Sequence, residues 1–458
     1  MKTYTPKLDP AVLQRLRDYA TLFAVDFPHA KPARWSGVYL QGLLLDGERK
    51  SIEPLARRIT LPEGLSSKDP EQALQQFVNQ SPWDEFAVLR RYRARMAKAF
   101  ADTEGIFVID DTSFPKQGTH SVGVQRQYCG ALGKKANCQV AVSVHYVSPA
   151  GHYPLDLRLY LPDCWLEDPA RLDEAGVPVT ERRALTKPEI ALELLDRVRG
   201  EGLPGRTVVA DAAYGVSPTF RNGIAARGLV YIVGVTGDHV VFPKQPRWVV
   251  GSPNPRGRPP TRGYLAPDNP PPVALQELAR RVRLRKVTWR EGSKGKMSAR
   301  FAWLRVWPGH DWQHGSCALA QPVWLLIEEQ ADGTFKFAFS NLPVGTRCRT
   351  AVRLWKSRWP VEQGYQQLKE ELGLDHFEGR SWRGFHHHAA LVLLAYGFLV
   401  LERQRAGKAE KPVKKKSVHQ AECAGDSAGA ATAPGPARGG SVPTLQKIAR
   451  CTDTDLTE

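Results

Sequence analysis

Two short apolar segments, one hundred positions apart, both end in aspartate, and together they constrain the fold strongly. IFVIDD covers residues 106–111, and RTVVAD covers residues 206–211. Short continuous apolar runs of this kind are typical of strands that are buried on both faces of a sheet. A polar residue at the end of such a strand lies at the edge of the sheet. We therefore expect Asp111 and Asp211 at the ends of interior strands.

The surrounding segments predict the order of the elements. Alternating residues at 138–147 and 152–162, joined by SPAG, predict a hairpin. Helical spacing predicts helices at 188–202 and 217–228, and residues 229–235 form a further strand. The order is β-β-β-α-β-α-β, an antiparallel start followed by right-handed crossovers to parallel strands. This is the order of the RNase H-like α/β fold, in which the first and fourth strands lie side by side.

The charge of the chain indicates a polyanionic partner. The 458 residues include 64 Lys and Arg against 47 Asp and Glu, a net charge of +17. Such a surplus favours nucleic acid, because cations neutralise phosphates and release counterions. A helix predicted over 83–100 carries Arg90, Arg91, Arg93, Arg95 and Lys98. These cations either lie along phosphates or form a solvated face.

The cysteines and the apolar segments predict a cytoplasmic, nucleoid-associated protein without a membrane span. The seven cysteines are widely spaced, with no CxxC pair, which fits a reducing compartment. No secretory leader pattern opens the sequence. The longest apolar stretch, at 389–401, is too short to span a bilayer comfortably and predicts a buried helix.

Changes in composition divide the chain into five predicted regions. The composition shifts between 241 and 275, where residues 242–272 are rich in proline, arginine and glycine. Four strand-like segments follow, and we interpret 241–344 as an insertion in the core. The end of the chain is of low complexity and basic at its start. The regions are a helical DNA-recognition region (1–100), the first part of the core (101–240), a β-rich insertion (241–344), the C-terminal helices of the core (345–403) and a disordered basic tail (404–458).

Asp111 and Asp211 would lie close together if they end adjacent strands. A single aspartate at a strand end is more often a turn cap. Two adjacent carboxylates repel each other unless a cation lies between them, and Mg²⁺ binds one or two carboxylates together with water and phosphate oxygens. Two such ions can activate a nucleophile and stabilise the leaving oxygen of a phosphoryl transfer.

A third carboxylate lies in the amphipathic stretch at 354–373. Glu362, Tyr365 and Lys369 share one face of the predicted helix. With Trp355 and Arg358, this stretch resembles the Tyr-x2-Arg-x3-Glu-x6-Lys signature of one branch of the DDE transposases of insertion sequences, with tryptophan in place of tyrosine. The segments DDTSFPKQG, SVGVQRQYCGALGKKANCQVAVS, VVADAAYG and GLDHFEGRSW are also similar to this family.

The resemblance implies a DNA transposase with an RNase H-like core. Asp111, Asp211 and Glu362 would be the catalytic residues and would bind two Mg²⁺ ions, or Mn²⁺ in their place. The enzyme would cleave transposon ends and join the 3′-hydroxyl to target DNA, as a homodimer on two double-stranded ends. Arg358 and Lys369 would hold phosphates near the cut.

Two details of the motifs stay open. Asp110 and Asp111 point to opposite faces of a strand, so only one can bind the metal. The Asp-x-Thr/Ser pattern allows either residue, and we prefer Asp111. Trp355 cannot offer a hydroxyl to a phosphate, and Pro360 fits only if a helix begins there.

Other residues have a functional and a structural interpretation. Lys116, Arg126, Lys134 and Lys135 flank the first motif and either contact the DNA backbone or lie in solvated loops. Three consecutive residues of one helix cannot chelate a metal together. We therefore expect no metal site in the histidine run at 386–388. The four tryptophans of the insertion (Trp303, Trp307, Trp312 and Trp324) are expected in its core rather than on a flipped base.

Two alternatives share these features. One is a catalytically silent DNA-binding protein descended from a transposase. The other is an RNase H-like nuclease that hydrolyses DNA without strand transfer.

Overall fold

The computed structural model describes residues 9–249, 263–292, 295–314 and 320–409. Its N-terminal part is helical, as predicted. Asp9, Asp69 and Asp84 each cap a helix, because their carboxylates accept a backbone N–H of the first turn. The helices are α1 (Pro10–Thr21), α2 (Ala30–Leu44), α3 (Ile52–Ala56), α4 (Pro70–Asn79) and α5 (Glu85–Phe100), with a 3₁₀ turn at Ala24–Asp26.

The centre of the molecule is a mixed sheet with the predicted order of strands. β1 pairs antiparallel with β3 and parallel with β5, which confirms that the first and fourth predicted strands are neighbours. β2, a short polar strand, was not predicted. The strands are β1 (Ile106–Pro115), β2 (Gln125–Cys129), β3 (Lys134–Ser148), β4 (Gly151–Leu159), β5 (Thr207–Ala210) and β6 (Val230–Val235).

Helices connect these strands as crossovers. The two predicted around the second aspartate strand, α8 and α10, are present, and α8 begins with a capping box formed by Thr186 and Glu189. The helical segments are α6 (Asp163–Leu166), α7 (Pro169–Glu174), a 3₁₀ turn at Val179–Glu181, α8 (Lys187–Gly200), α9 (Ala212–Gly215) and α10 (Pro218–Ala226).

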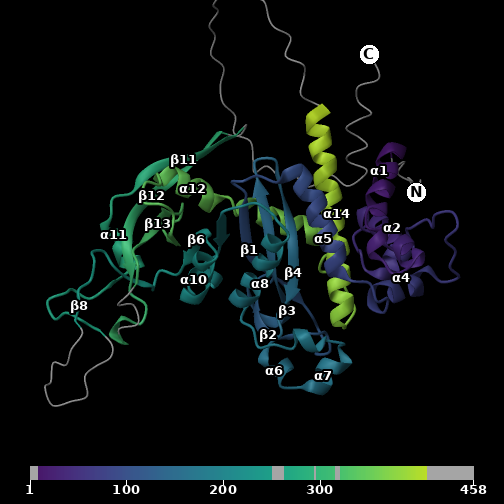
Figure 1. Cartoon of the computed structure of the whole chain (residues 1–458), viewed down its shortest axis with the longest axis horizontal. Helices are drawn as coiled ribbons and strands as arrows, with labels where there is room; N and C mark the ends of the chain where they lie inside the picture. Colours follow the sequence, from purple (N-terminus) through teal and green to yellow (C-terminus); the bar gives the residue numbers. More distant parts are fainter. Residues whose placement is uncertain (1–8, 250–262, 293–294, 315–319, 410–458) are drawn as a thin grey trace, which may run out of the picture.

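The four strands predicted for the insertion extend this same sheet (Figure 1). β14 pairs antiparallel with β6, and β13, β12 and β7 follow in order, with β11 beside β12. The pairing covers an edge of β6 that would otherwise expose unpaired backbone groups. The elements are β7 (Val240–Phe242), β8 (Trp248–Val249), β9 (Tyr264–Leu265), β10 (Val273–Ala274), α11 (Leu275–Arg281), β11 (Arg285–Gly292), β12 (Gly295–Pro308), a 3₁₀ turn at Trp312–His314, β13 (Val323–Glu329) and β14 (Phe335–Ser340).

The two faces of the sheet carry different helices. On one face, Ile109 of β1 belongs to the large core that includes Ile190 and Leu194 of α8. On the other face, Val108 belongs to a smaller core with residues of the C-terminal helices, among them Val352 and Val361. The C-terminal segments are α12 (Cys348–Lys356), α13 (Trp359–Gln366), a π-helical turn at Gln367–Glu371 and α14 (Trp382–Ala409).

α14 lies between the sheet and the N-terminal helices (Figure 1). It is long and apolar enough to cross a membrane by length and composition, but 94% of its apolar window is buried within the protein. It is therefore a core helix, as predicted for 389–401. Residues 404–409 of the predicted tail continue α14, and the remainder of that tail lies outside the described residues.

The histidine run lies at the start of α14 and is part of the core. His386 and His387 contact the carbonyl oxygens of Trp382 and Val78, each at 2.9 Å, and His388 contacts the Tyr39 hydroxyl at 2.8 Å. Burial lowers the pKa of all three imidazoles, so they are neutral. Their ring nitrogens have separate partners, and the three side chains do not form one metal site.

Candidate active site

Asp211 directly follows β5, as predicted, whereas Asp110 and Asp111 lie within β1, which continues to Pro115 because it stays paired with β3. Asp110 is the first residue of β1 beyond its parallel pairing with β5. The register pairs Val108 with Val209 and Ile109 with Ala210, so the two aspartates follow at the same level. Val108 and Val209 both pack in the core beneath α12 and α13. Since side chains alternate along a strand, Asp110 and Asp211, two positions later, also point to that face.

Both carboxylates have raised pKa values. Burial raises the pKa of Asp110 to about 7, Arg358 opposes this effect, and the charges of Asp211 and Asp111 add to it. Burial also raises the pKa of Asp211, again against the influence of Arg358, and here the charge of Asp111 adds to the effect. The Arg358 guanidinium lies 3.5 Å from the nearer Asp110 oxygen. The site therefore combines two partly desolvated carboxylates with a neighbouring cation, an arrangement typical of functional sites.

Asp111 has different surroundings. It shares the opposite face of β1 with Ile109, beside the start of α8. Its carboxylate forms an ion pair of 2.8 Å with the Nζ of Lys187, the first residue of α8. The contacts thus favour Asp110 over Asp111, the residue that we preferred from the sequence. Side chains alternate between the two faces of β1, and the two-residue motif alone does not show which aspartate lies on the face that α13 covers.

Glu362 lies on α13, next to residues that contact this site. Arg358, one turn before it, approaches Asp110. Tyr365, one turn after it, is hydrogen-bonded to the hydroxyl of Ser143, which is paired with Asp110 across β1 and β3. Glu362 is exposed between these two contacts. The helix that carries Glu362 therefore covers the face to which Asp110 and Asp211 point.

The start of α13 explains how Pro360 fits. Arg358 is the N-cap residue, and Pro360 occupies the first turn, where its missing N–H has no helical partner to lose. A helix therefore begins directly before Pro360, at Trp359, which is what the sequence requires for a proline at this position.

The carboxylates are suited to hold divalent cations. Asp110 and Asp211 are half-buried and have raised pKa values. A bound cation would stabilise their charged forms. Within the described residues, however, no three Asp, Glu, His or Cys side chains are grouped closely enough to hold one ion. A shared site for Asp110, Asp211 and Glu362 thus requires a change in side-chain positions when the cations bind.

Most of the other predicted site residues have structural contacts. The Nζ of Lys369 donates to the Ser113 carbonyl at 2.9 Å, and the Nζ of Lys116 donates to the Phe377 carbonyl at 2.7 Å. Burial lowers the pKa of both lysines. Arg126, on β2, is exposed and forms no ion pair with any residue of the described ranges.

The tryptophans also have structural contacts. The Nε1 of Trp355 donates to the buried Glu328 carboxylate at 2.9 Å, so Trp355 packs instead of facing a phosphate. Trp303 and Trp324 stack at 4.6 Å, and their N–H groups donate to the carbonyls of Thr346 and Leu342. All four tryptophans of the insertion are half-buried, so they do not lie fully in its core as expected. Trp303 and Trp324 pack against the smaller core.

The arginines of α5 are mainly structural. Arg93 is fully buried and forms ion pairs with Glu201 at 2.5 Å and with Asp156 at 3.3 Å. Arg91 pairs with Asp26 at 2.5 Å. The sequence allowed a phosphate-binding row or a solvated face, and the structure instead gives these two arginines carboxylate partners.

Sequence reasoning missed Tyr214 and Lys187. Tyr214, in α9, is buried, and its hydroxyl has no hydrogen-bond partner within the described residues. Burial raises the pKa of the Tyr214 hydroxyl well above its ordinary value, and the charges of Asp111 and Asp110 add to this effect. Its position in VVADAAYG, three residues after Asp211, was the available signal. Lys187 carried no signal, because its contact with Asp111 depends on how α8 packs.

The fold and site match a known class of proteins. The profile of a family described as "DDE superfamily endonuclease" matches residues 22–296, and the chain belongs to this family. The matched part includes Asp110 and Asp211 and ends before Glu362. Membership implies an RNase H-like core, action on DNA and the use of divalent metal ions.

One curated relative is more specific. The chain is 32% identical over 208 residues to a "Probable transposase for insertion sequence element IS701" from Microchaete diplosiphon. The match covers 44% of this chain and 50% of the relative, so the chain spans about half the length of the curated protein that it matches.

Proposed function

We propose that this protein is a DNA transposase that cleaves transposon ends and joins the 3′-hydroxyl to target DNA. The observation that carries the proposal is the placement of Asp110 and Asp211 at the same level of the neighbouring strands β1 and β5, on the face covered by the helix of Glu362. The similarity to a probable insertion-sequence transposase supports the same reaction. Assembly as a homodimer on two DNA ends and nucleoid association remain parts of this proposal.

We assign the metal ligands to Asp110, Asp211 and Glu362. When bound, two Mg²⁺ ions would neutralise phosphate charge and make a water or hydroxyl a better nucleophile at neutral pH. Asp110 and Asp211 are fixed by the sheet, whereas Glu362 is exposed on α13 and can adjust its side chain. Asp111 is not assigned as a ligand, because Lys187 already balances its charge.

Arg358 is the residue best placed to orient the scissile phosphate. Its guanidinium lies beside Asp110, and its Nε is buried without a hydrogen-bond partner within the described residues. A planar guanidinium can donate to two phosphate oxygens at once. Lys369, in contrast, would have to leave the Ser113 carbonyl before it could contact DNA.

A single experiment separates transposition from the alternatives. Intact and pre-nicked DNA fragments that carry the sequences flanking the gene are incubated, in separate reactions, with supercoiled target DNA and Mg²⁺. Joined product is the expected result. Cleavage of intact fragments without joining would indicate a nuclease, and binding alone would indicate a silent descendant of a transposase.

The Glu362→Gln variant controls this experiment. The amide keeps the shape of the side chain but removes the negative charge that a cation requires. We expect unchanged binding to the DNA fragments and loss of cleavage. Cutting near the unmodified rate would exclude Glu362 from the reaction.

A further inference from the structure

Two stretches of the chain carry positive charges without any negative ones. Residues 282–290 include four Lys and Arg, and residues 333–361 include six, and neither stretch contains Asp or Glu. The first stretch contains most of β11, and the second contains α12 and the residues leading to Glu362. Together the two stretches cover 38 of the 458 residues and contain ten of the 64 Lys and Arg residues.

The two stretches meet in the folded protein. α12 packs against β11, where Val287 and Trp289 contact the core that includes Ala351 and Val352. Lys356 also lies over the Trp289 ring, at 5.0 Å. β11 and α12 therefore form one continuous surface.

Four arginines project from this surface: Arg285, Arg290, Arg349 and Arg353. We call this set the α12–β11 face. All four are exposed, and none forms an ion pair with a carboxylate in the part of the chain that the structure describes. Arg285 is paired with the buried Phe301, so it is on the α12 side of the sheet. Arg349 and Arg353 are one turn apart on α12, opposite its buried residues.

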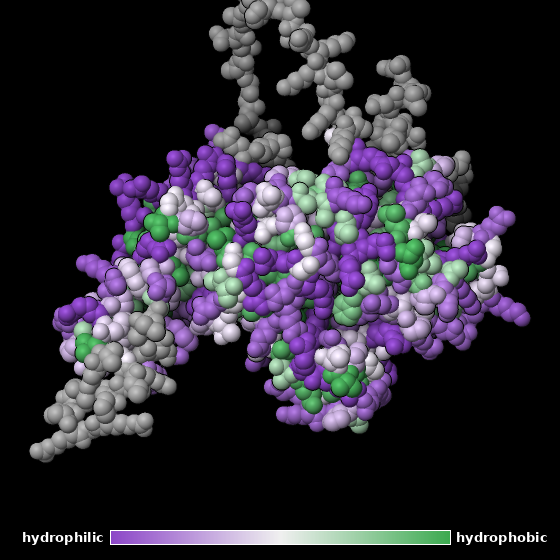
Figure 2. Space-filling model, viewed as in Figure 1, coloured by the Kyte–Doolittle hydropathy of each residue, from purple (hydrophilic) through white to green (hydrophobic). Residues whose placement is uncertain are grey.

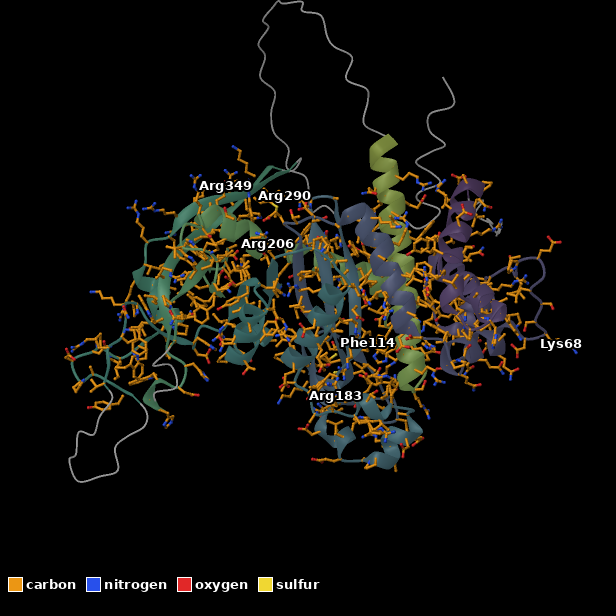
Figure 3. All side chains as sticks on the ribbon, viewed as in Figure 1. Lys68, Phe114, Arg183, Arg206, Arg290 and Arg349 are labelled. Atoms are coloured by element: carbon orange, nitrogen blue, oxygen red, sulfur yellow. The ribbon has the colours of Figure 1, made fainter. Side chains whose placement is uncertain are left out.

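Two carboxylates of the adjoining strand β13 have other partners. Glu328 is buried and accepts from Trp355 and Lys356. Glu329 pairs with Arg300 at 3.0 Å. Figure 3 shows Arg290 and Arg349 directed outward along the upper edge of the molecule, and Figure 2 shows this edge as mainly hydrophilic surface. Within the described side chains, the face is thus a positive surface without a carboxylate partner, unlike Arg91 and Arg93 of α5.

We propose that the α12–β11 face binds the phosphate backbone of duplex DNA and guides it toward the candidate active site. The proposal rests on the proposed function, since it assumes that DNA is the substrate. α12 leads directly into Arg358, which lies beside Asp110, and into α13, which carries Glu362. A backbone that follows α12 would therefore arrive at the carboxylates. Binding by ionic contacts alone would be independent of sequence.

The salt dependence of DNA binding tests this face. Affinity of the full chain for a short fluorescent DNA duplex is measured by anisotropy over a series of NaCl concentrations. Each lost phosphate contact lowers the slope of log affinity against log salt by about 0.9. The double variant Arg349→Gln/Arg353→Gln should therefore reduce the slope by about two.

A matched double variant controls for the loss of two charges. Lys244→Gln/Arg280→Gln removes two exposed cations outside the face, and Arg280 belongs to α11, whose Leu275 and Leu278 pack into the core on the opposite side of the sheet. The control should retain the unmodified slope. Equal slopes for the unmodified chain and the Arg349/Arg353 variant would overturn the proposal, as would an equal decrease in the control.

Two further outcomes are informative. If the unmodified chain does not bind duplex DNA, both this proposal and the proposed function fail. If it binds DNA but the slope does not depend on Arg349 and Arg353, only the face is wrong. Tighter binding of an RNA duplex through the same residues would contradict the assignment of DNA as the partner.

Discussion

Asp110 and Asp111 are adjacent in the sequence but have opposite surroundings. Asp110 is buried near Asp211 and Arg358, whereas Asp111 is neutralised by Lys187. We expect Asp110→Asn to reduce metal-dependent cleavage by about a hundredfold or more, because charge stabilisation by a bound metal is worth several kcal/mol. Asp111→Asn should change the rate only a few-fold. Single-turnover cleavage assays measure both rates, and the reverse ranking would refute the assignment of Asp110.

The raised pKa of Asp110 also predicts how stability depends on pH without metal. In the unfolded chain its carboxyl ionises near pH 3.8, and in the folded protein near pH 7. The folded state therefore holds the proton more tightly, and this residue makes the protein less stable as the pH rises between these values. The cost at pH 8 is on the order of a few kcal/mol.

Asp110→Asn removes this cost. In EDTA, the variant should unfold at a higher temperature than the unmodified protein at pH 8, and the difference should shrink toward pH 4. Thermal unfolding followed by circular dichroism at several pH values measures this. A variant that is less stable at pH 8 would show that the Asp110 carboxylate is not a destabilising buried charge.

The sequence narrows the proposed metal ligand of β1 only to two neighbouring residues. The two buried strands and their adjacency were predictable, because apolar runs and the order of elements define them, but the continuation of β1 past Asp111 to Pro115 was not. The choice between Asp110 and Asp111 depends on which face α13 covers, and this depends on packing between segments more than two hundred residues apart. The contacts of Lys187 with Asp111 and of Lys369 with Ser113 also depend on tertiary packing, across 76 and 256 residues of sequence.

At the level of elements, α5 is held to the sheet by a buried ionic network. Arg93 contacts both Glu201 and Asp156. Arg93→Ala should lower the free energy of unfolding by about 3 kcal/mol, because it removes the main partner of Glu201 and leaves the buried Asp156 with Arg197 alone. Lys98→Gln, an exposed change on the same helix, should have an effect within about 0.5 kcal/mol. Chemical denaturation measures both values, and similar small effects would show that the network contributes little.

At the level of the whole molecule, the predicted insertion is continuous with the core. Its strands were recognisable from their alternating residues, but their pairing with β6 was not, because strand order beyond neighbouring segments depends on tertiary contacts. Replacing 241–344 with a short linker would expose the edge of β6. We expect the product to aggregate or to lose cooperative unfolding.

Solubility and thermal melts of this deletion variant test the continuity of the sheet. A soluble fragment that unfolds cooperatively would show instead that 241–344 is an independent module. An unmodified chain purified in parallel is the control.

The most direct test of the account is the position of Mn²⁺ in crystals of the DNA-bound protein, measured by anomalous scattering. We expect peaks about 2.0–2.3 Å from carboxylate oxygens of Asp110, Asp211 and Glu362. Mn²⁺ bound by Asp111 instead of Asp110, or Glu362 away from every peak, would contradict the proposal that these three side chains form one metal site.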